Sequence, residues 1–274
     1  MIQGTTSSAG KSTIVTALCR IFVQKGIDVF PFKAQNMSRN YMHTNTGKRI
    51  SSAQFVQAHA ARIEPSELMN PVLLVPETDV GSEVVILGKS YKYMKAREYF
   101  EYKSELKEKI KEIYDEISSK HELIVIEGAG SPAEINLNEN DFVNTGMAEI
   151  ADADVLLVTD IDRGGSFASL YGTVMLLKEE DRKRVKGFII NKFRGDKSLL
   201  DSGLKMIEEL TGIPVIGVIP YTHLEIVDED SLIEYRKHAH CCFDPVMLED
   251  EIERLAGIVT ENMDIDKILK MLEE

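Results

Sequence analysis

The sequence has no tryptophan, only three cysteines and no long run of apolar residues. A membrane-spanning helix needs about 18 to 20 consecutive apolar residues, so no such span is expected. The cysteines, Cys19, Cys241 and Cys242, do not suffice for a disulfide framework, and a reducing cytoplasm is the simplest setting. No cleavable signal pattern precedes the first glycine-rich segment. We therefore expect a cytoplasmic protein that does not enter a membrane.

Positive charge is also in short supply. The formal net charge is −13, from 45 acidic and 32 basic residues. This balance argues against nucleic acid as a main partner. It does not exclude anionic small molecules, because backbone N–H groups at a helix N-terminus can bind phosphate on an acidic protein. The 274 residues, of which 43% are hydrophobic, suit one large domain or two small ones.

A glycine-rich segment near the N-terminus is typical of a phosphate-binding loop. Residues 2–13 read IQGTTSSAGKST, with five residues between Gly4 and Gly10 where the usual pattern has four. An apolar strand pattern precedes the loop and an amphipathic helix pattern follows it. Lys11 is expected to reach the outer phosphates of a nucleotide, and Ser12 to bind Mg²⁺ through its hydroxyl. The predicted nucleotide-binding residues here are Gly4, Thr5, Thr6, Ala9, Gly10, Lys11, Ser12 and Thr13.

Short apolar segments alternate with helical patterns along the chain. Strands are expected at residues 1–4, 29–32, 84–87, 123–126, 155–159, 186–190 and 215–219, and helices at 11–25, 53–63, 104–120, 167–177 and 199–211. This alternation predicts an α/β fold of the P-loop NTPase type, with a mostly parallel sheet and helices on both faces. The strands are followed by Gly4, Lys33, Glu127, Asp160 and Asn191. Because ligands bind at that edge of such sheets, these residues should converge on one crevice.

Two charged residues at this edge suggest chemistry. Lys33 is expected to contact phosphate or a substrate carboxylate, with a solvated lysine at the strand end as the alternative. Gln35 and Asn36 beside it offer amide groups to a polar ligand. Glu127 stands where a buried strand meets a Gly-Ala-Gly segment, which favours Mg²⁺ binding over a helix-capping or loop-bracing role.

Several longer motifs follow one another as in the cobyric acid synthase family, whose loop resembles that of dethiobiotin synthetase. They are QGTTSSAGKS, PFKAQNM, MNPVLL, AREYFEYK, IEGAGSPAEINL, DIDRGG, VKGFIINKFRGD and GVIPY, and the match spans residues 1–232. The resemblance implies ATP- and Mg²⁺-dependent amidation of peripheral carboxylates of a corrinoid, adenosylcobyrinic acid a,c-diamide, in cobalamin biosynthesis. In the implied chemistry a carboxylate attacks the γ-phosphate, and ammonia then attacks the acyl phosphate. Such catalysis relies on positioning and charge neutralisation.

The resemblance also implies roles for single residues, and it is compatible with a homodimer. Residues implied in catalysis are Lys11, Lys33, Glu127 and Asp160, and those implied in metal binding are Ser12 and Glu127. Asn191 would bind the adenine edge with Pro220 packed nearby, although an asparagine can also simply end a strand. Substrate contacts are implied for Gln35, Asn36, Ser131, Asp162, Arg163 and Gly164. For the segment that follows Asp160, a purely local Asp–Arg brace is the alternative.

The same resemblance divides the chain into two parts. Residues 1–232 correspond to the amide synthetase domain, and residues 233–274 to a linker and a C-terminal helical segment. A class I glutaminase domain usually follows the synthetase part, and the residues after Leu232 are too few to form it. Ammonia is therefore expected from solution or from a separate glutaminase subunit. His238–Cys242 lacks the usual spacing of a zinc site, so a flexible linker is the preferred interpretation.

Three positions depart from the family pattern. Arg49 stands where an acidic residue is common, Val75 where a lysine is usual, and Glu83 where a glutamine is usual. These departures leave open a diverged paralogue with another acidic substrate, or a catalytically silent subunit. A ParA/MinD-like ATPase switch is a further alternative, but its second loop lysine is missing from residues 5–8. Dethiobiotin synthetase lacks the SPAEINL motif.

Overall fold

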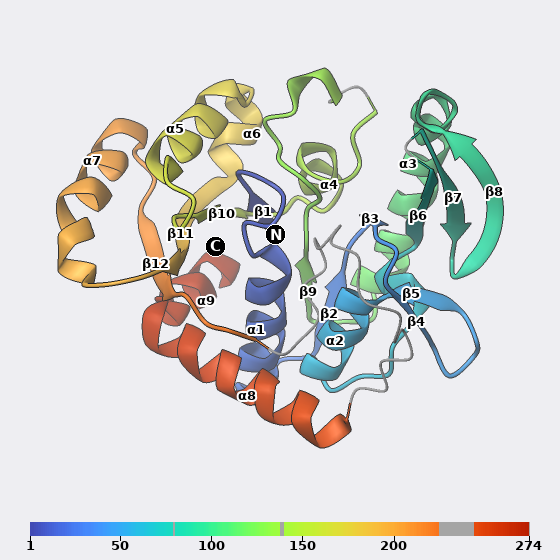
Figure 1. The fold of residues 1–274 in the computed structure, drawn as a ribbon, viewed down its shortest axis with the longest axis horizontal. Coiled ribbons are helices and arrows are strands. Elements are labelled where there is room, and N and C mark those ends of the chain that lie inside the picture. Colours follow the sequence, from blue (N-terminus) through green and yellow to red (C-terminus); the bar gives the residue numbers. More distant parts are fainter. Residues whose placement is uncertain (79, 138–139, 225–243, 274) are drawn as a thin grey trace.

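Two parallel sheets adjoin at the centre of the molecule. The computed structural model describes residues 1–78, 80–137, 140–224 and 244–273. One sheet has the order β1-β10-β11-β12 and the other pairs β2 with β9. The Glu127 N–H donates to the Phe32 carbonyl at 2.8 Å and so continues the pairing of β9 with β2. The Gly128 N–H donates to the Ile2 carbonyl of β1 at 2.8 Å, which joins the two sheets. The result is one parallel layer in the order β2-β9-β1-β10-β11-β12 (Figure 1).

The strands of this layer are β1 Ile2–Gly4, β2 Val29–Phe32, β9 Leu123–Ile126, β10 Val155–Asp160, β11 Val185–Phe193 and β12 Val215–Pro220. Side chains alternate between the two faces of each strand. On β10, Leu156 and Val158 pack with α1 and α8 on one face. Leu157 packs with α5 and α7 on the opposite face. The predicted parallel α/β fold with helices on both faces is confirmed.

The helices are α1 Lys11–Gln24, α2 Ser52–Ala60, α3 Ala96–Ser118, α4 Thr145–Ile150, α5 Ser166–Leu176, α6 Glu179–Arg184, α7 Asp201–Thr211, α8 Pro245–Asn262 and α9 Ile265–Glu273. On α1 the apolar stripe through Ile14, Leu18 and Phe22 is fully buried. This helix ends before Gly26, whose φ of 86° is a left-handed conformation that glycine adopts freely. Among the helices described, none is long and apolar enough to cross a membrane.

A second, partly antiparallel sheet extends beyond β2, and the sequence patterns did not predict most of it. Its order is β3-β6-β7-β8, and a hairpin of β4 and β5 lies beside it (Figure 1). The bounds are β3 Gln35–Met37, β4 Tyr41–His43, β5 Arg49–Ser51, β6 Val72–Thr78, β7 Gly81–Ile86 and β8 Lys89–Lys95. Only β7 corresponds to a predicted strand. The edge strand β8, KSYKYMK, is mostly exposed and carries three lysines, so it lacks the apolar content of a buried strand.

Element boundaries differ from prediction at two places that matter for the site. The third predicted helix begins at Ala96 rather than at residue 104, which brings the AREYFEYK motif into α3. The strand predicted to end at residue 190 continues to Phe193, so Asn191 lies inside β11. Both were missed because polar residues interrupt the apolar pattern while the backbone pairing or helical turns continue.

The C-terminal helices pack into the same core as the loop helix α1. Leu248, Ile252 and Leu255 of α8 are buried in the cluster that contains Leu18 and Phe22. Arg20 of α1 is fully buried and donates to both carboxylate oxygens of Glu249, at 2.6 and 2.8 Å, and to Glu253. The structure therefore ties α8 to the nucleotide-loop helix. The proposed linker, including His238–Cys242, lies outside the described residues.

Candidate active site

The predicted phosphate loop connects β1 to the N-terminus of α1. Gly10 has a φ of 97°, and a Cβ on it would lie 2.0 Å from the amide nitrogen of Asn191. Asn191 is buried and donates to the carbonyl of Ala9 at 3.0 Å. Thr5 anchors the start of the loop, where its hydroxyl donates to Thr159 on β10 at 3.1 Å. Because any side chain at position 10 would collide with Asn191, this position requires glycine. The contacts of Asn191 and Thr159 support the loop from β11 and β10.

Lys11 is the first residue of α1, and its ammonium lies under the loop. It is 5% exposed, and its Nζ donates to the carbonyls of Thr6 at 3.3 Å and Gly130 at 3.2 Å. Phosphate oxygens are stronger acceptors than carbonyls for an ammonium. Lys11 is therefore held where a phosphate could compete for it, between the loop and the glycine segment after β9.

Glu127 is the centre of the site. It follows β9, is 1% exposed, and its Oε1 accepts from the Ser12 hydroxyl at 2.8 Å and from Lys33 Nζ at 2.8 Å. Its Oε2 accepts from Gln57 at 2.6 Å and from Gln54 at 3.5 Å. Lys33 is 5% exposed, so the alternative of a solvated lysine at the strand end is wrong. A buried ion pair is tolerated because these further donors satisfy the carboxylate.

Sequence reasoning missed a network of polar residues behind Glu127. Gln54 and Gln57 are fully buried and stand one turn apart on α2. The Asn36 amide donates to Ser51 at 2.6 Å and to Gln54 at 3.2 Å. Asn36 is only 3% exposed, so a substrate contact at this residue would require the network to open. The available signal was the spacing of two glutamines on an otherwise apolar helix, since buried amides need partners.

A second cluster forms around Asp160, at the end of β10. Its Oδ2 accepts from Lys192 at 3.1 Å, and the Arg163 guanidinium is farther away, at 3.7 Å. Lys192, which the sequence patterns did not single out, also donates to the carbonyl of Ser8 at 2.7 Å. It has a φ of 60°, a strained conformation for a non-glycine residue. Asp160 is therefore coupled to the phosphate loop through Lys192, more directly than through a local Asp–Arg brace.

Two further loops border the site. Asp162 accepts from Arg194 at 2.8 Å, and the Arg194 guanidinium lies 3.3 Å from the ring centre of Tyr221, next to Pro220 at the end of β12. Gly164 has a positive φ of 77° and is exposed. On the other side, the Ser131 hydroxyl accepts from the Ala133 N–H at 3.2 Å and closes a local turn. Predicted residues from both loops thus reach the same edge of the sheet.

The geometry of the loop and the motif at Glu127 can now be compared with known proteins. The family described as the CobQ/CobB/MinD/ParA nucleotide binding domain matches residues 1–232. The chain belongs to this family.

Among curated relatives, the cobyric acid synthase of Streptococcus sanguinis is 59% identical over 237 residues, 86% of this chain and 48% of that protein. That of Alkaliphilus metalliredigens is 57% identical over 232 residues, 85% of this chain and 46% of that protein. The chain thus spans about half the length of the curated relatives it matches. Among solved structures, the cell division protein MinD of Aquifex aeolicus gives a TM-score of 0.43 at 15% identity, covering 81% of each chain.

The three positions that depart from the cobyric acid synthase pattern lie together. The Arg49 guanidinium on β5 binds both carboxylate oxygens of Glu83 on β7, at 2.6 and 2.8 Å. Val75 on β6 is the direct cross-strand partner of Glu83. Residues opposite each other in a ladder share a face of the sheet. The three positions therefore form one local cluster on the sheet extension, with an ion pair between positions 49 and 83.

The residues of the site fit a nucleotide and a magnesium ion. A Cβ on Gly4 would lie 2.9 Å from the Thr6 carbonyl, so the loop closes as tightly as a phosphate cradle requires. Ser12 and Glu127 bring two oxygen ligands within 2.8 Å of each other. Mg²⁺ commonly takes only one or two protein ligands and completes its shell with water and phosphate. In the part of the chain that the structure describes, no three His, Cys, Asp or Glu side chains cluster as a metal site.

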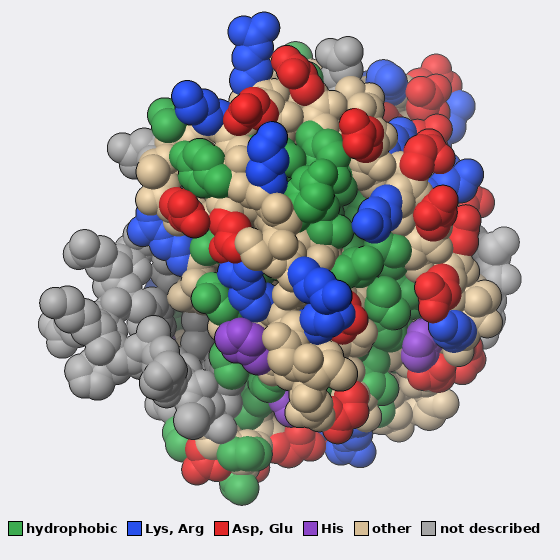
Figure 2. All heavy atoms as spheres, turned by 90° about the vertical axis from the view of Figure 1, so that its right-hand side faces the viewer, with side chains coloured by type: hydrophobic (Ala, Val, Ile, Leu, Met, Phe, Trp, Pro, Cys, Tyr) green, Lys and Arg blue, Asp and Glu red, His purple; other side chains and the backbone are tan. Residues whose placement is uncertain are grey.

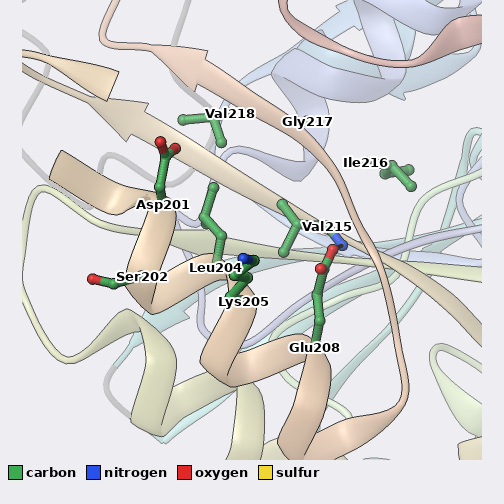
Figure 3. Close-up of a pocket in the computed structure, with 9 residues that line it drawn as sticks. All are labelled: Asp201, Ser202, Leu204, Lys205, Glu208, Val215, Ile216, Gly217 and Val218. Carbon is green, nitrogen blue, oxygen red and sulfur yellow. Dashed lines mark hydrogen bonds between the residues drawn. The ribbon is translucent and has the colours of Figure 1, made fainter. Parts of the chain in front are cut away.

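A separate hollow between α7 and β12 contains none of the predicted site residues. Figure 3 shows Leu204 and Val215 inside it, with Lys205 and Glu208 also among its lining residues. The Glu208 carboxylate accepts from the Val215 N–H at 2.7 Å. The Glu208 carboxylate therefore has a structural role, because it links α7 to β12. We therefore place the active site at the phosphate loop and not in this hollow.

Proposed function

We propose that residues 1–232 form an ATP- and Mg²⁺-dependent amide synthetase domain that acts on peripheral carboxylates of a corrinoid. By analogy with cobyric acid synthases, its substrate would be adenosylcobyrinic acid a,c-diamide and its product cobyric acid. The observation that supports this most is the convergence of Ser12, Lys33 and Glu127 beside the phosphate loop. Activation of a carboxylate by phosphoryl transfer needs this combination of cation, metal ligand and phosphate cradle.

Each residue of the cluster has a separate task in this proposal. Lys11 neutralises charge on the outer phosphates. Ser12 and Glu127 would hold Mg²⁺, which would supply positive charge against the charge that develops on the phosphate. Lys33, which binds Glu127 in this structure, would exchange that partner for the reacting carboxylate or phosphate. The Lys192 ammonium and the Asp160 carboxylate keep the loop in register with β10.

ATP supplies the phosphoryl group that turns a substrate carboxylate into an acyl phosphate, with ADP as the leaving group. The protein's part is to align the two reactants and to exclude water from them. Ammonia then displaces phosphate from the acyl carbon and loses a proton to give the amide. We propose that ammonia comes free from solution or from a glutaminase subunit. Cys19 is not suited to release ammonia from glutamine as a nucleophile, because it is fully buried and burial raises the pKa of its thiol.

The decisive experiment is mass spectrometry of the corrinoid after incubation with the protein, ATP, Mg²⁺ and ammonium chloride. Conversion of carboxylates to amides is expected, at a rate that rises with pH as free ammonia increases. Lys11→Ala should abolish conversion and weaken ATP binding by on the order of 2–4 kcal/mol, because a charged phosphate contact is lost. No conversion by a wild-type protein that binds ATP would exclude corrinoid amidation and favour a diverged or regulatory role.

The ion pair between Arg49 and Glu83 bears on that alternative. The diverged and the catalytically silent interpretations depend on substitutions at positions 49, 75 and 83. These three residues lie together on the sheet extension, where Arg49 and Glu83 form an ion pair. Glu127 still accepts hydrogen bonds from Ser12, Lys33 and Gln57. The separation of these positions from the contacts of Glu127 favours an enzyme that has kept its amidation activity and differs only in the packing of the sheet extension. Steady ATP hydrolysis without corrinoid, stimulated by a protein partner, would instead indicate a MinD-like switch.

A further inference from the structure

Helix α3 buries a lysine on the stripe that faces the core. Leu106, Ile110 and Ile113 of this stripe are buried in the apolar cluster beneath the helix. One turn nearer the N-terminus, the same stripe continues with Lys103, which is 9% exposed. Lysine is almost never buried without a charged partner. Its position therefore calls for an explanation that packing does not provide.

The Lys103 ammonium has no acceptor among the residues that the structure describes. Its nearest recorded contact is the face of Phe142, with Nζ 5.3 Å from the ring centre. The neighbouring Asp141 carboxylate is occupied at the start of α4, where it accepts from the N–H groups of Val143 at 3.0 Å and Gly146 at 2.8 Å. Burial lowers the pKa of Lys103, and the charge of Asp141 opposes that shift. The side chain is thus largely buried, while its Nζ lies over an aromatic ring, open to solvent and without a hydrogen-bond acceptor in the described part of the chain.

A second donor without an acceptor lies nearby. Tyr99, one turn before Lys103 on α3, donates its hydroxyl to Oε1 of Gln35 at 2.6 Å. This contact fixes the orientation of the Gln35 amide and leaves its NH₂ group as the outward donor. Among the described residues, none accepts from that nitrogen. Gln35 follows Lys33 by two residues, and Lys33 binds Glu127, so the Gln35 donor is close in the chain to the proposed chemistry.

The chain order explains why these groups meet. Helix α3 leads into β9, so its N-terminal half lies toward the edge of the sheet where β9 ends at Glu127. The segment from β9 to α4 then returns across α3 and places Phe142 against Lys103. Figure 1 shows α3 beside the β6–β8 extension, with α4 between it and the loop helix. Figure 2, which views this side of the molecule from outside, shows mixed acidic and basic side chains with no broad basic patch.

We propose that Lys103 and the amide nitrogen of Gln35 bind a carboxylate of the substrate and thereby position the corrinoid beside Lys33 and Glu127. Two accessible donors without an acceptor in the described part of the chain favour an acceptor ligand, and an ammonium favours one that carries negative charge. The phosphates of the nucleotide are expected at Lys11, so the remaining anion is the polycarboxylate substrate. The identity of that substrate rests on the proposed function; the preference for a carboxylate rests on the donors alone.

The test compares Lys103→Met with Lys109→Met, which removes an exposed lysine from the same helix. Lys103→Met should raise the KM for adenosylcobyrinic acid a,c-diamide by about 10- to 100-fold, the loss expected for one charged hydrogen bond. The KM for ATP should stay within about twofold of the wild-type value. The apparent Tm without substrate should be unchanged or higher, because a largely buried lysine without a hydrogen-bond acceptor is replaced by an apolar side chain. Lys109→Met should change none of these.

Two results would overturn the proposal. One is an unchanged corrinoid KM in Lys103→Met. The other is a lower Tm with both KM values raised, which would make Lys103 a structural anchor on Phe142. If Lys103→Met does not fold, Gln35→Leu at a half-buried position provides the second variant, with a KM increase of about 3- to 10-fold for loss of one donor.

A simple carboxylate separates this proposal from the proposed function. If the wild-type protein does not amidate the corrinoid, tricarballylate is titrated while the Tm is measured. Ligand that binds only the folded state raises the Tm with concentration. A rise for the wild type and for Lys109→Met, but not for Lys103→Met, would support a carboxylate site even though the substrate had been misidentified. Equal rises for all three proteins would contradict it.

Discussion

Two ion pairs in this protein have different surroundings and, we infer, different purposes. Lys33 and Glu127 meet at the carboxyl edge of the parallel layer, with side chains 6% and 0% exposed. Arg49 and Glu83 meet on the antiparallel extension, with side chains 16% and 20% exposed. The first pair shares its carboxylate with a serine and two glutamines. The second is a bidentate pair that largely satisfies itself.

The two ion pairs differ in how easily the cation can change its partner. A lysine ammonium is a point charge that can exchange one partner for another, whereas a bidentate arginine fork fixes both geometry and partner. Glu127 also lies next to the phosphate loop, where a metal could replace Lys33. Arg49 connects β5, which the sequence patterns did not predict, to β7. We therefore expect changes at Glu127 to affect turnover and changes at Arg49 to affect stability.

The largest effect is expected for Glu127→Gln, which keeps the shape of the side chain and removes its charge. Turnover should fall by at least about 100-fold, because a metal ligand that acts on transition-state charge is lost. ATP should still bind, since Lys11 and the loop are unchanged. Steady-state kinetics with calorimetry of ATP binding measures both quantities. Wild-type turnover in this variant would show that the two ion pairs are alike.

Arg49→Glu should act in the opposite way. It places two carboxylates face to face and should lower the free energy of unfolding by about 2 kcal/mol, with turnover per folded molecule retained. Glu83→Gln in the Arg49→Glu background should recover most of this loss, because it removes the repulsion between the two carboxylates. Chemical denaturation of the two single variants and the double variant gives the coupling energy. An additive double variant would mean that positions 49 and 83 are independent.

A smaller effect on turnover is expected for Gln57→Leu. This change removes the donor at 2.6 Å from Glu127 Oε2 and leaves the carboxylate free to rotate. Turnover should fall by about 10-fold, as one hydrogen bond to a charged group is lost. Gln24→Leu, which removes an exposed amide on α1, is the matched control. A change in ATP affinity with constant turnover would place Gln57 in nucleotide binding instead.

The smallest effect concerns pH. The Arg49 guanidinium lowers the pKa of Glu83 from its ordinary 4.5 to about 2. A lowered carboxyl pKa stabilises the fold above the unfolded value and loses that contribution as pH falls from 4.5 toward 2. The wild type should therefore exceed Glu83→Gln in unfolding free energy by on the order of 1–2 kcal/mol at pH 6, and the difference should shrink below pH 4. A constant difference from pH 6 to pH 3 would contradict the pairing.

Much of the site could be predicted because short-range patterns encode it. The spacing of Gly4, Gly10 and Lys11 specifies a loop between a strand and a helix, and apolar strands specify a parallel layer. Parallel strands place their carboxyl ends at one edge, so Lys33 and Glu127 could be expected to meet before any distance was known. The family membership of residues 1–232 follows from the same local motifs.

The tertiary structure decided what no local pattern carries. That Gln54 and Gln57 hold Glu127 depends on how α2 packs against β9, and Lys192 reaches the loop only because its backbone turns to a positive φ. The meeting of Arg49 with Glu83 depends on strand register across two hairpins. The sequence alone predicts an ordinary surface lysine at position 103. In the structure, Phe142 from the segment after β9 packs over Lys103. The same physical reason applies to the two glutamines, to Lys192, to the Arg49–Glu83 pair and to Lys103. Which polar groups become buried or paired depends on segments that are far apart in the sequence and meet only in the folded chain.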